Sequence, residues 1–126
     1  MQITGLPQVK LETIEGVSLR SLFLLIFNFR HSCRVVGESM IPTICPGDFV
    51  IYKPIKGVKF NPSEGTIVIA KDPLDPKGLT VKRILKYNNK GIILRGDNYI
   101  NSIDSRQYGF IHPNNLFGIV EKIISP

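Results

Sequence analysis

The chain has 126 residues, 43% of them hydrophobic, and a formal net charge of +6 at pH 7. This length is enough for one domain with its own core, and no second domain is required. The sixteen Lys and Arg residues are scattered, without a run of like charges or interleaved aromatic residues, which argues against nucleic-acid binding and for a solvated basic surface.

Cysteine and histidine usage argues against a metal or disulfide scaffold. Cys33 and Cys45 have neither metal-ligand spacing nor the density of a disulfide framework, which predicts reduced thiols in a cytoplasmic protein. His31 and His112 are isolated from each other and from any carboxylate cluster, so they are predicted to be surface residues. We therefore expect no metal and no cofactor.

Residues 1–33 are predicted to form a loosely held, partly disordered N-terminal arm with one short apolar run. The run consists of Leu22, Phe23, Leu24, Leu25, Ile26 and Phe27. It is too short for a membrane span, which needs about twenty residues. Two glutamates before it and the lack of a small-residue pair after it make a cleaved signal sequence a poor fit. Burial in the fold and a weak peripheral contact with a membrane or partner protein both remain open.

Residues 34–126 predict a mostly β domain of short strands. The expected strands cover residues 49–52, 66–70, 79–86, 91–95 and 117–124. The Pro46-Gly47-Asp48 sequence suits a turn, since proline fixes its φ and glycine tolerates a positive one. Residues 88–91 (Asn-Asn-Lys-Gly) predict a hairpin connection, and the proline-rich residues 72–78 join two strands.

The first segment that can carry catalytic chemistry is residues 37–43 (Gly-Glu-Ser-Met-Ile-Pro-Thr). Gly37 lets backbones approach closely and Pro42 limits any helix to a short turn, so the Ser39 hydroxyl is expected to lie exposed at a bend. The Ser39 N–H would suit a developing oxyanion if substrate lies alongside Gly37. Met40 is expected to point into apolar packing.

The second segment is the apolar strand that contains Lys82. Alternation along residues 79–85 places Thr80, Lys82 and Ile84 on one face. Burial disfavours an ammonium ion, so an amine on this face can be neutral near pH 7 and accept a proton from Ser39. Arg83 lies on the opposite face and is expected to stay charged.

The third segment, residues 95–106, places small, acidic and basic residues between apolar strands, as in a site wall built from hydrogen bonds. Asp104 and Arg106 lie two residues apart, so in an extended chain they share a face. They are expected to form an ion pair. In a purely structural interpretation, this ion pair only stabilises a loop.

With all three segments in order, the chain resembles the signal peptidase I superfamily of Ser/Lys peptidases. The family boxes read Ser-Met-x-Pro-Thr, Lys-Arg-Ile/Val and Gly-Asp-Asn…Ser-x-Asp-Ser-Arg, and each is intact here. The resemblance implies a signal-peptidase/LexA-like β-rich peptidase core of short antiparallel strands, with Ser39 as nucleophile and Lys82 as general base. It implies that Ser102 orients the lysine and that Asp104 and Arg106 support the site, beside Gly96, Asp97 and Asn98. Gly37 stands where some signal peptidases carry an oxyanion-binding hydroxyl, so the backbone N–H must suffice.

Only thirteen residues separate Lys82 from Gly96, which implies a minimal version without the extra β-domain that many membrane-bound relatives insert there. Such a version is most similar to the nickel-type superoxide dismutase maturation proteases. That resemblance implies removal of an N-terminal leader from the superoxide dismutase precursor.

Two alternatives have different consequences. A general signal peptidase would act on exported preproteins at the membrane. A self-cleaving or non-catalytic LexA-like binding module would act through binding, but its usual Ala-Gly or Cys-Gly cleavage bond is absent: Ala70 precedes Lys71, and neither cysteine precedes a glycine.

Overall fold

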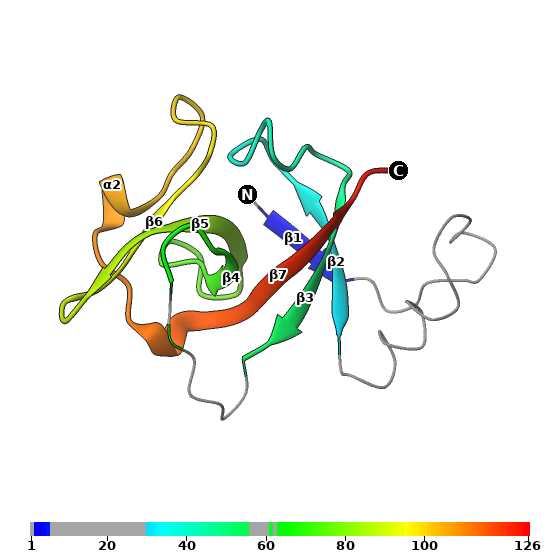
Figure 1. Cartoon of the computed structure of the whole chain (residues 1–126). Coiled ribbons are helices and arrows are strands. Elements are labelled where there is room, and N and C mark those ends of the chain that lie inside the picture. Colours follow the sequence, from blue (N-terminus) through cyan, green and yellow to red (C-terminus); the bar gives the residue numbers. More distant parts are fainter. Residues whose placement is uncertain (1, 6–29, 56–60, 62) are drawn as a thin grey trace.

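The computed structural model describes residues 2–5, 30–55, 61 and 63–126. The strands in this part of the chain form one antiparallel sheet of order β1-β2-β3-β7-β4-β5-β6 (Figure 1). They are β1 (Gln2–Gly5), β2 (His31–Val36), β3 (Phe49–Pro54), β4 (Ile67–Lys71), β5 (Leu79–Asn88), β6 (Gly91–Arg95) and β7 (Leu116–Ile124). Two short helical segments accompany them, α2 (Ser105–Tyr108) and η2 (Pro113–Asn115). The mostly β fold expected from the sequence is confirmed.

The central strand of the sheet is β7. It pairs with β3 on one edge and with β4 on the other, and both ladders contain a register shift. Register shifts bend strands and increase their twist. Strand β7 therefore joins a β1-β2-β3 half to a β4-β5-β6 half, and Figure 1 shows it running between them.

All five strands expected from the sequence are present, with ends that differ by a few residues. Strands β1 and β2 were not predicted from the sequence, since residues 2–5 and 31–33 lie within the stretch expected to form an arm. The first two residues of β2 are polar, which obscured an alternation that buries Cys33 and Val35. The apolar run at residues 22–27 lies outside the described residues. Within the described residues, no helix is long and apolar enough to cross a membrane.

The expected turns form as their residues require. Gly47 has φ of +93°, and the Asp48 N–H donates to the Cys45 carbonyl at 3.0 Å. Asn88 faces Gly91 across the β5–β6 hairpin, so two residues make that connection. The whole stretch between Lys82 and Gly96 is this hairpin, which leaves no room for an inserted domain there.

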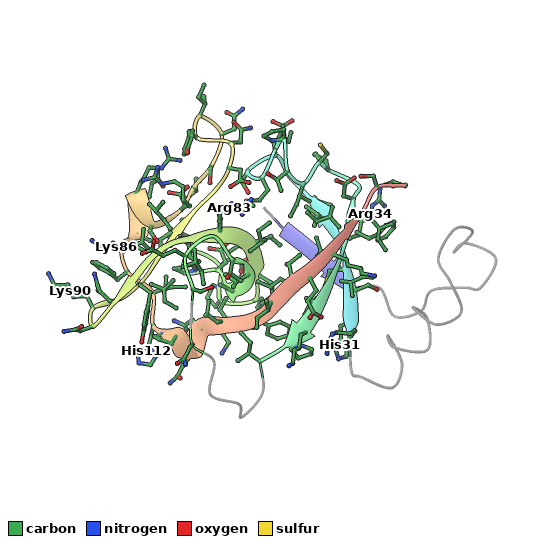
Figure 2. All side chains as sticks on the ribbon, in the orientation of Figure 1. His31, Arg34, Arg83, Lys86, Lys90 and His112 are labelled. Carbon is green, nitrogen blue, oxygen red and sulfur yellow. The ribbon has the colours of Figure 1, made fainter. Side chains whose placement is uncertain are left out.

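Apolar side chains form two buried clusters. The first core cluster comprises Cys33, Val35, Met40, Ile44, Val50, Tyr52, Ile69 and Val81. The second core cluster comprises Val68, Ala70, Ile84, Ile92, Leu94, Ile111 and Leu116. Strand β4 contributes alternate residues to both clusters, so it is buried on both faces. In contrast, the basic side chains labelled in Figure 2 are spread over different sides of the molecule.

The outer edge of β6 is covered by the segment that follows it. Three main-chain N–H groups on this edge have partners: Ile92 donates to the Ile111 carbonyl at 2.9 Å, Leu94 to Ser105 Oγ at 2.8 Å, and the adjoining Gly96 to Asp104 Oδ2 at 2.9 Å. These bonds hold residues 102–111 against the sheet and fix the polar wall beside β5.

Candidate active site

Ser39 lies in a turn that follows β2 directly. Gly37 has φ of +91°, a conformation open to glycine, and so lets the chain reverse at the end of the strand. Met40 is fully buried in the first core cluster, as expected from the sequence. The Ile41–Pro42 peptide bond is cis. The Met40 anchor fixes the turn, and with it the adjacent Ser39, against the core.

Lys82 projects from β5 toward this turn. Its Nζ lies 2.9 Å from Ser39 Oγ and 3.0 Å from Thr80 Oγ1. The lysine is fully buried, and Val68 is its cross-strand neighbour. The structure therefore brings the two residues predicted as a dyad into direct hydrogen-bond contact.

The accessibility of Ser39 differs from the expectation. An exposed hydroxyl was predicted, but Ser39 is only 3% exposed. Its hydroxyl turns inward to meet the amine of Lys82, and Met40 draws the adjoining backbone onto the core. The nucleophile candidate is consequently covered in this structure.

Burial determines the protonation of the lysine. It lowers the pKa of Lys82 to about 8, and the carboxylates of Asp104 and Asp72 partly counteract that shift. A substantial fraction of the amine is therefore neutral close to physiological pH. In the neutral form, the 2.9 Å contact allows Nζ to accept the Ser39 proton.

The wall of the site is organised around Asp104, which is fully buried. Its Oδ2 accepts hydrogen bonds from the Gly96 N–H and the Ser102 hydroxyl, both at 2.9 Å. Arg106 donates to Oδ1 at 3.0 Å through Nε. Burial raises the pKa of Asp104, but the hydrogen bonds from Arg106, Gly96 and Ser102 outweigh it and lower the pKa to about 2. Asp104 is thus a fixed negative charge near Lys82.

The expected ion pair of Asp104 and Arg106 is present, but not in an extended chain. Asp104 is the N-cap of α2, and the side chain of Gln107 accepts from the Asp104 N–H at 2.8 Å to complete a capping box. The Asp-Ser-Arg-Gln sequence therefore begins a helix. The sequence analysis did not anticipate this helix.

Ser102 does not make the hydrogen bond expected of it, and Thr80 makes one that was not expected. The described contacts of Lys82 do not include the expected hydrogen bond from Ser102, whose hydroxyl donates to Asp104 instead. Thr80 takes that place, since it lies two residues before Lys82 on the same strand face. Sequence alternation had placed Thr80 on this face, and its hydroxyl was the overlooked signal.

Asn98 connects the polar wall (residues 95–106) to the turn at residues 37–43 that carries Ser39, which we call the nucleophile turn. Its N–H donates to the Ser39 carbonyl at 2.9 Å, and its side-chain amide donates to the Glu38 carbonyl at 3.0 Å. Gly96 lies equally close: a Cβ there would be 2.1 Å from Ser102 Oγ and 2.6 Å from the Ser39 carbonyl oxygen. Only glycine fits at this point of closest approach.

Asp97, in the polar wall, contacts both β5 and the nucleophile turn. Arg83 donates to both of its oxygens, at 2.9 Å from Nε and 2.7 Å from Nη2. Thr43, in the nucleophile turn, donates to Oδ2 of the same carboxylate. The pair therefore fastens the strand that carries Lys82 to the turn that carries Ser39.

Metal chemistry has no evident place in the described part of the chain. No group of three or more His, Cys, Asp or Glu residues there could hold an ion. Cys33 and Cys45 are free thiols, the first buried and the second exposed.

The comparisons with known proteins agree with this geometry. Residues 4–112 match the Peptidase S24-like family. The chain belongs to this family. It is also 34% identical over 93 residues to the mitochondrial inner membrane protease subunit 1 of Mus musculus and to the Homo sapiens protein of the same name. Each alignment covers 58% of this S24-like chain and 56% of the relative. The chain thus spans little more than half the length of these curated relatives.

Proposed function

We propose that this S24-like protein is a serine endopeptidase that removes an N-terminal leader from a precursor protein. The observation that carries the proposal is the 2.9 Å contact between Ser39 Oγ and the buried amine of Lys82. A serine becomes an effective nucleophile when an adjacent base takes its proton.

In the proposed reaction, neutral Lys82 takes the Ser39 proton as Oγ attacks the scissile carbonyl carbon. Collapse of the tetrahedral intermediate breaks the C–N bond, and Lys82 donates the proton to the leaving amine. Water then attacks the Ser39 ester while Lys82 again accepts a proton. Breakage of the ester bond releases the acid product, and Lys82 returns the proton to Ser39 Oγ, which restores both the serine and the neutral amine.

The main-chain N–H of Ser39 is the proposed oxyanion donor. Among the described residues it has no hydrogen-bond acceptor, whereas the Ser39 carbonyl is occupied by Asn98. A free N–H adjacent to the nucleophile can stabilise the negative charge that develops on the substrate oxygen. Gly37 adds no side-chain donor, so the backbone carries this role.

Two substrate classes follow from different observations. The Gly-Glu-Ser-Met-Ile-Pro-Thr and Arg-Gly-Asp-Asn segments resemble those of nickel superoxide dismutase maturation proteases, which favours the precursor of that enzyme. The names of the curated relatives favour a processing peptidase that acts at a membrane. A cytoplasmic location goes with the first substrate class and a membrane-peripheral one with the second.

The proposal is tested by incubating the purified chain with a nickel superoxide dismutase precursor, and separately with an exported preprotein in lipid vesicles. Mass spectrometry then identifies any new N-terminus. We expect cleavage at the leader junction of one substrate, and its loss in both Ser39→Ala and Lys82→Ala. Circular dichroism of the variants controls for folding. Cleavage that persists in Lys82→Ala would refute the dyad.

A further inference from the structure

The outer edge of β2 leads directly into the nucleophile turn. Val35 has its N–H bonded to the Asp48 carbonyl and its C=O bonded to the Gly47 N–H, both at 2.8 Å, so its main chain faces the β3 side. Because main-chain groups alternate along a strand, those of Arg34 and Val36 face the opposite edge. Strand β1 occupies that edge.

The register defines how β1 fills it. Thr4 lies opposite Arg34, and Gln2 lies opposite Val36. The alternation makes these two the hydrogen-bonded pairs of the ladder. Strand β1 therefore supplies the main-chain hydrogen-bond partners along the outer edge of β2, as far as Val36, the residue before Gly37.

Strand β1 also lies against β5, the strand that carries Lys82. Figure 1 shows it between β2 and the β4-β5-β6 half of the sheet. It is thus inserted between the strand that leads to Ser39 and the strand that supplies the amine. A polypeptide whose carbonyl meets Ser39 and whose leaving nitrogen meets Lys82 has to run through this space.

The two candidate dyad residues beside this space are closed to solvent. Ser39 is 3% exposed and Lys82 is fully buried. A carbonyl carbon cannot contact Oγ of so covered a serine, so part of the molecule must move before a substrate is bound.

We propose that β1 is an inhibitory strand that occupies the substrate's place and must leave before an extended polypeptide can bind. The inference rests on the proposed peptidase function. Each strand has two edges, and β3 already occupies the inner edge of β2. An extended segment that pairs with β2 by strand addition therefore competes directly with residues 2–5.

Accessibility of position 39 tests the inference without a substrate. The full chain carrying Ser39→Cys is treated with iodoacetamide, and alkylation is followed by mass spectrometry. Exposed Cys45 is the internal reference for reactivity, and circular dichroism reports any global unfolding. Thr4→Pro is added because proline removes the N–H that pairs with Arg34, and Thr4→Val, which keeps it, is the matched control.

If β1 is docked in about nine molecules of ten, its release speeds alkylation of the introduced thiol by about tenfold relative to Cys45. Thr4→Val should leave the rate unchanged. Equal rates for Thr4→Pro and Thr4→Val, with unchanged circular dichroism, would overturn the inference.

A disulfide lock provides a second test that does not require Thr4→Pro to fold. Gly5 faces Cys33 in the register, at a position where paired Cα atoms lie about 4.5 Å apart, within reach of a disulfide. Oxidised Gly5→Cys should lose hydrolysis of fluorescein-labelled, unfolded casein, and dithiothreitol should restore it. Gly5→Ser is the control.

Full hydrolysis by the oxidised Gly5→Cys protein would overturn the inference while leaving the peptidase proposal intact. No Ser39-dependent hydrolysis in any variant would count against the peptidase function instead. The alkylation rates would then still decide whether β1 covers Ser39.

Discussion

Thr80 and Lys82 form a pair on a single strand face. The threonine hydroxyl lies 3.0 Å from the lysine amine, and both side chains are buried. A lysine has four rotatable side-chain bonds, so a fixed acceptor near its end restricts the positions of Nζ. Thr80 thereby directs the amine toward Ser39.

Replacement of Thr80 by valine keeps the shape of the side chain but removes this hydrogen bond. We expect Thr80→Val to lower kcat by about tenfold, the effect of losing roughly 1.4 kcal/mol of positioning. The KM value should stay unchanged, because Thr80 is buried behind the amine. Steady-state kinetics would check this expectation, with Thr80→Ser as a variant that restores the rate. An equal loss in Thr80→Ser would contradict a role for the hydroxyl.

The pH dependence of activity follows from the same amine. Because the pKa of Lys82 is about 8 and the proposed base is the neutral amine, kcat/KM should rise with pH up to about 8 and then level off. The Asp72 carboxylate raises the pKa of Lys82, so Asp72→Asn should move the midpoint to lower pH. A complete pH–rate profile of each protein measures this shift.

Asp75→Asn is a matched control within the same loop. Asp75 accepts from the Lys77 N–H as Asp72 accepts from the Leu74 N–H, so both substitutions leave a similar turn in place. An identical midpoint in the Asp72→Asn and wild-type proteins would contradict the electrostatic influence of Asp72.

At the scale of elements, Asp104 joins β6, the wall segment and α2. Its carboxylate accepts from Gly96 at the end of β6, from Ser102 in the wall and from Arg106 in the helix. It is also the N-cap of α2. A single buried charge therefore determines how three pieces of chain meet behind Lys82.

Asp104→Ala should destabilise the fold and weaken activity together. The substitution removes the N-cap of α2 and leaves several hydrogen-bond donors without their acceptor. We expect this to lower the free energy of unfolding by about 3 kcal/mol. Urea denaturation would measure the loss, and Asp104→Asn, which keeps an acceptor for the cap, should be intermediate. Wild-type stability in Asp104→Ala would show that the wall is held by other contacts.

The strands were predictable where the sequence has short apolar runs between turn residues. Residues 79–86 form such a run, and β5 lies there with Lys82 on the same face as Thr80 and Ile84, as predicted. Strand β1 could not be predicted, because its pairing with β2 depends on residues far away in the chain.

Within the site, the motifs predicted which residues come together but not all of their bonds. The contact of Ser39 with Lys82 is present, yet Ser102 binds Asp104 and Thr80 binds the lysine. These choices depend on where the side chains lie in three dimensions, which residue spacing does not encode. The covered state of Ser39 likewise results from packing rather than local sequence.

For the molecule as a whole, the buried amine is a cost to stability. The ordinary lysine pKa is 10.5, and burial lowers that of Lys82 to about 8. Below pH 8 both folded and unfolded chains hold the proton, so the full penalty for burying the charge is present. Between pH 8 and 10.5 the unfolded chain binds more protons than the folded one, and the stability should therefore rise with pH.

Lys82→Met should accordingly stabilise the fold while abolishing activity. We expect a gain of about 1–3 kcal/mol at pH 7, since an apolar side chain of similar length replaces a desolvated charge. The gain should shrink as the pH approaches 10.5. Denaturation at several pH values tests this, with Ser39→Ala as an inactive control that keeps the lysine. A less stable Lys82→Met protein at pH 7 would mean that the two lost hydrogen bonds outweigh the desolvation.

The central position of β7 has a consequence for the order of events on the ribosome. Both members of the dyad leave the exit tunnel before residues 116–124, yet those residues form the strand that joins their two halves of the sheet. Since the nascent chain emerges from its N-terminus, the two halves lack the strand that pairs with both of them until β7 is synthesised. The sheet around Ser39 and Lys82 is therefore completed only after translation has passed residues 116–124.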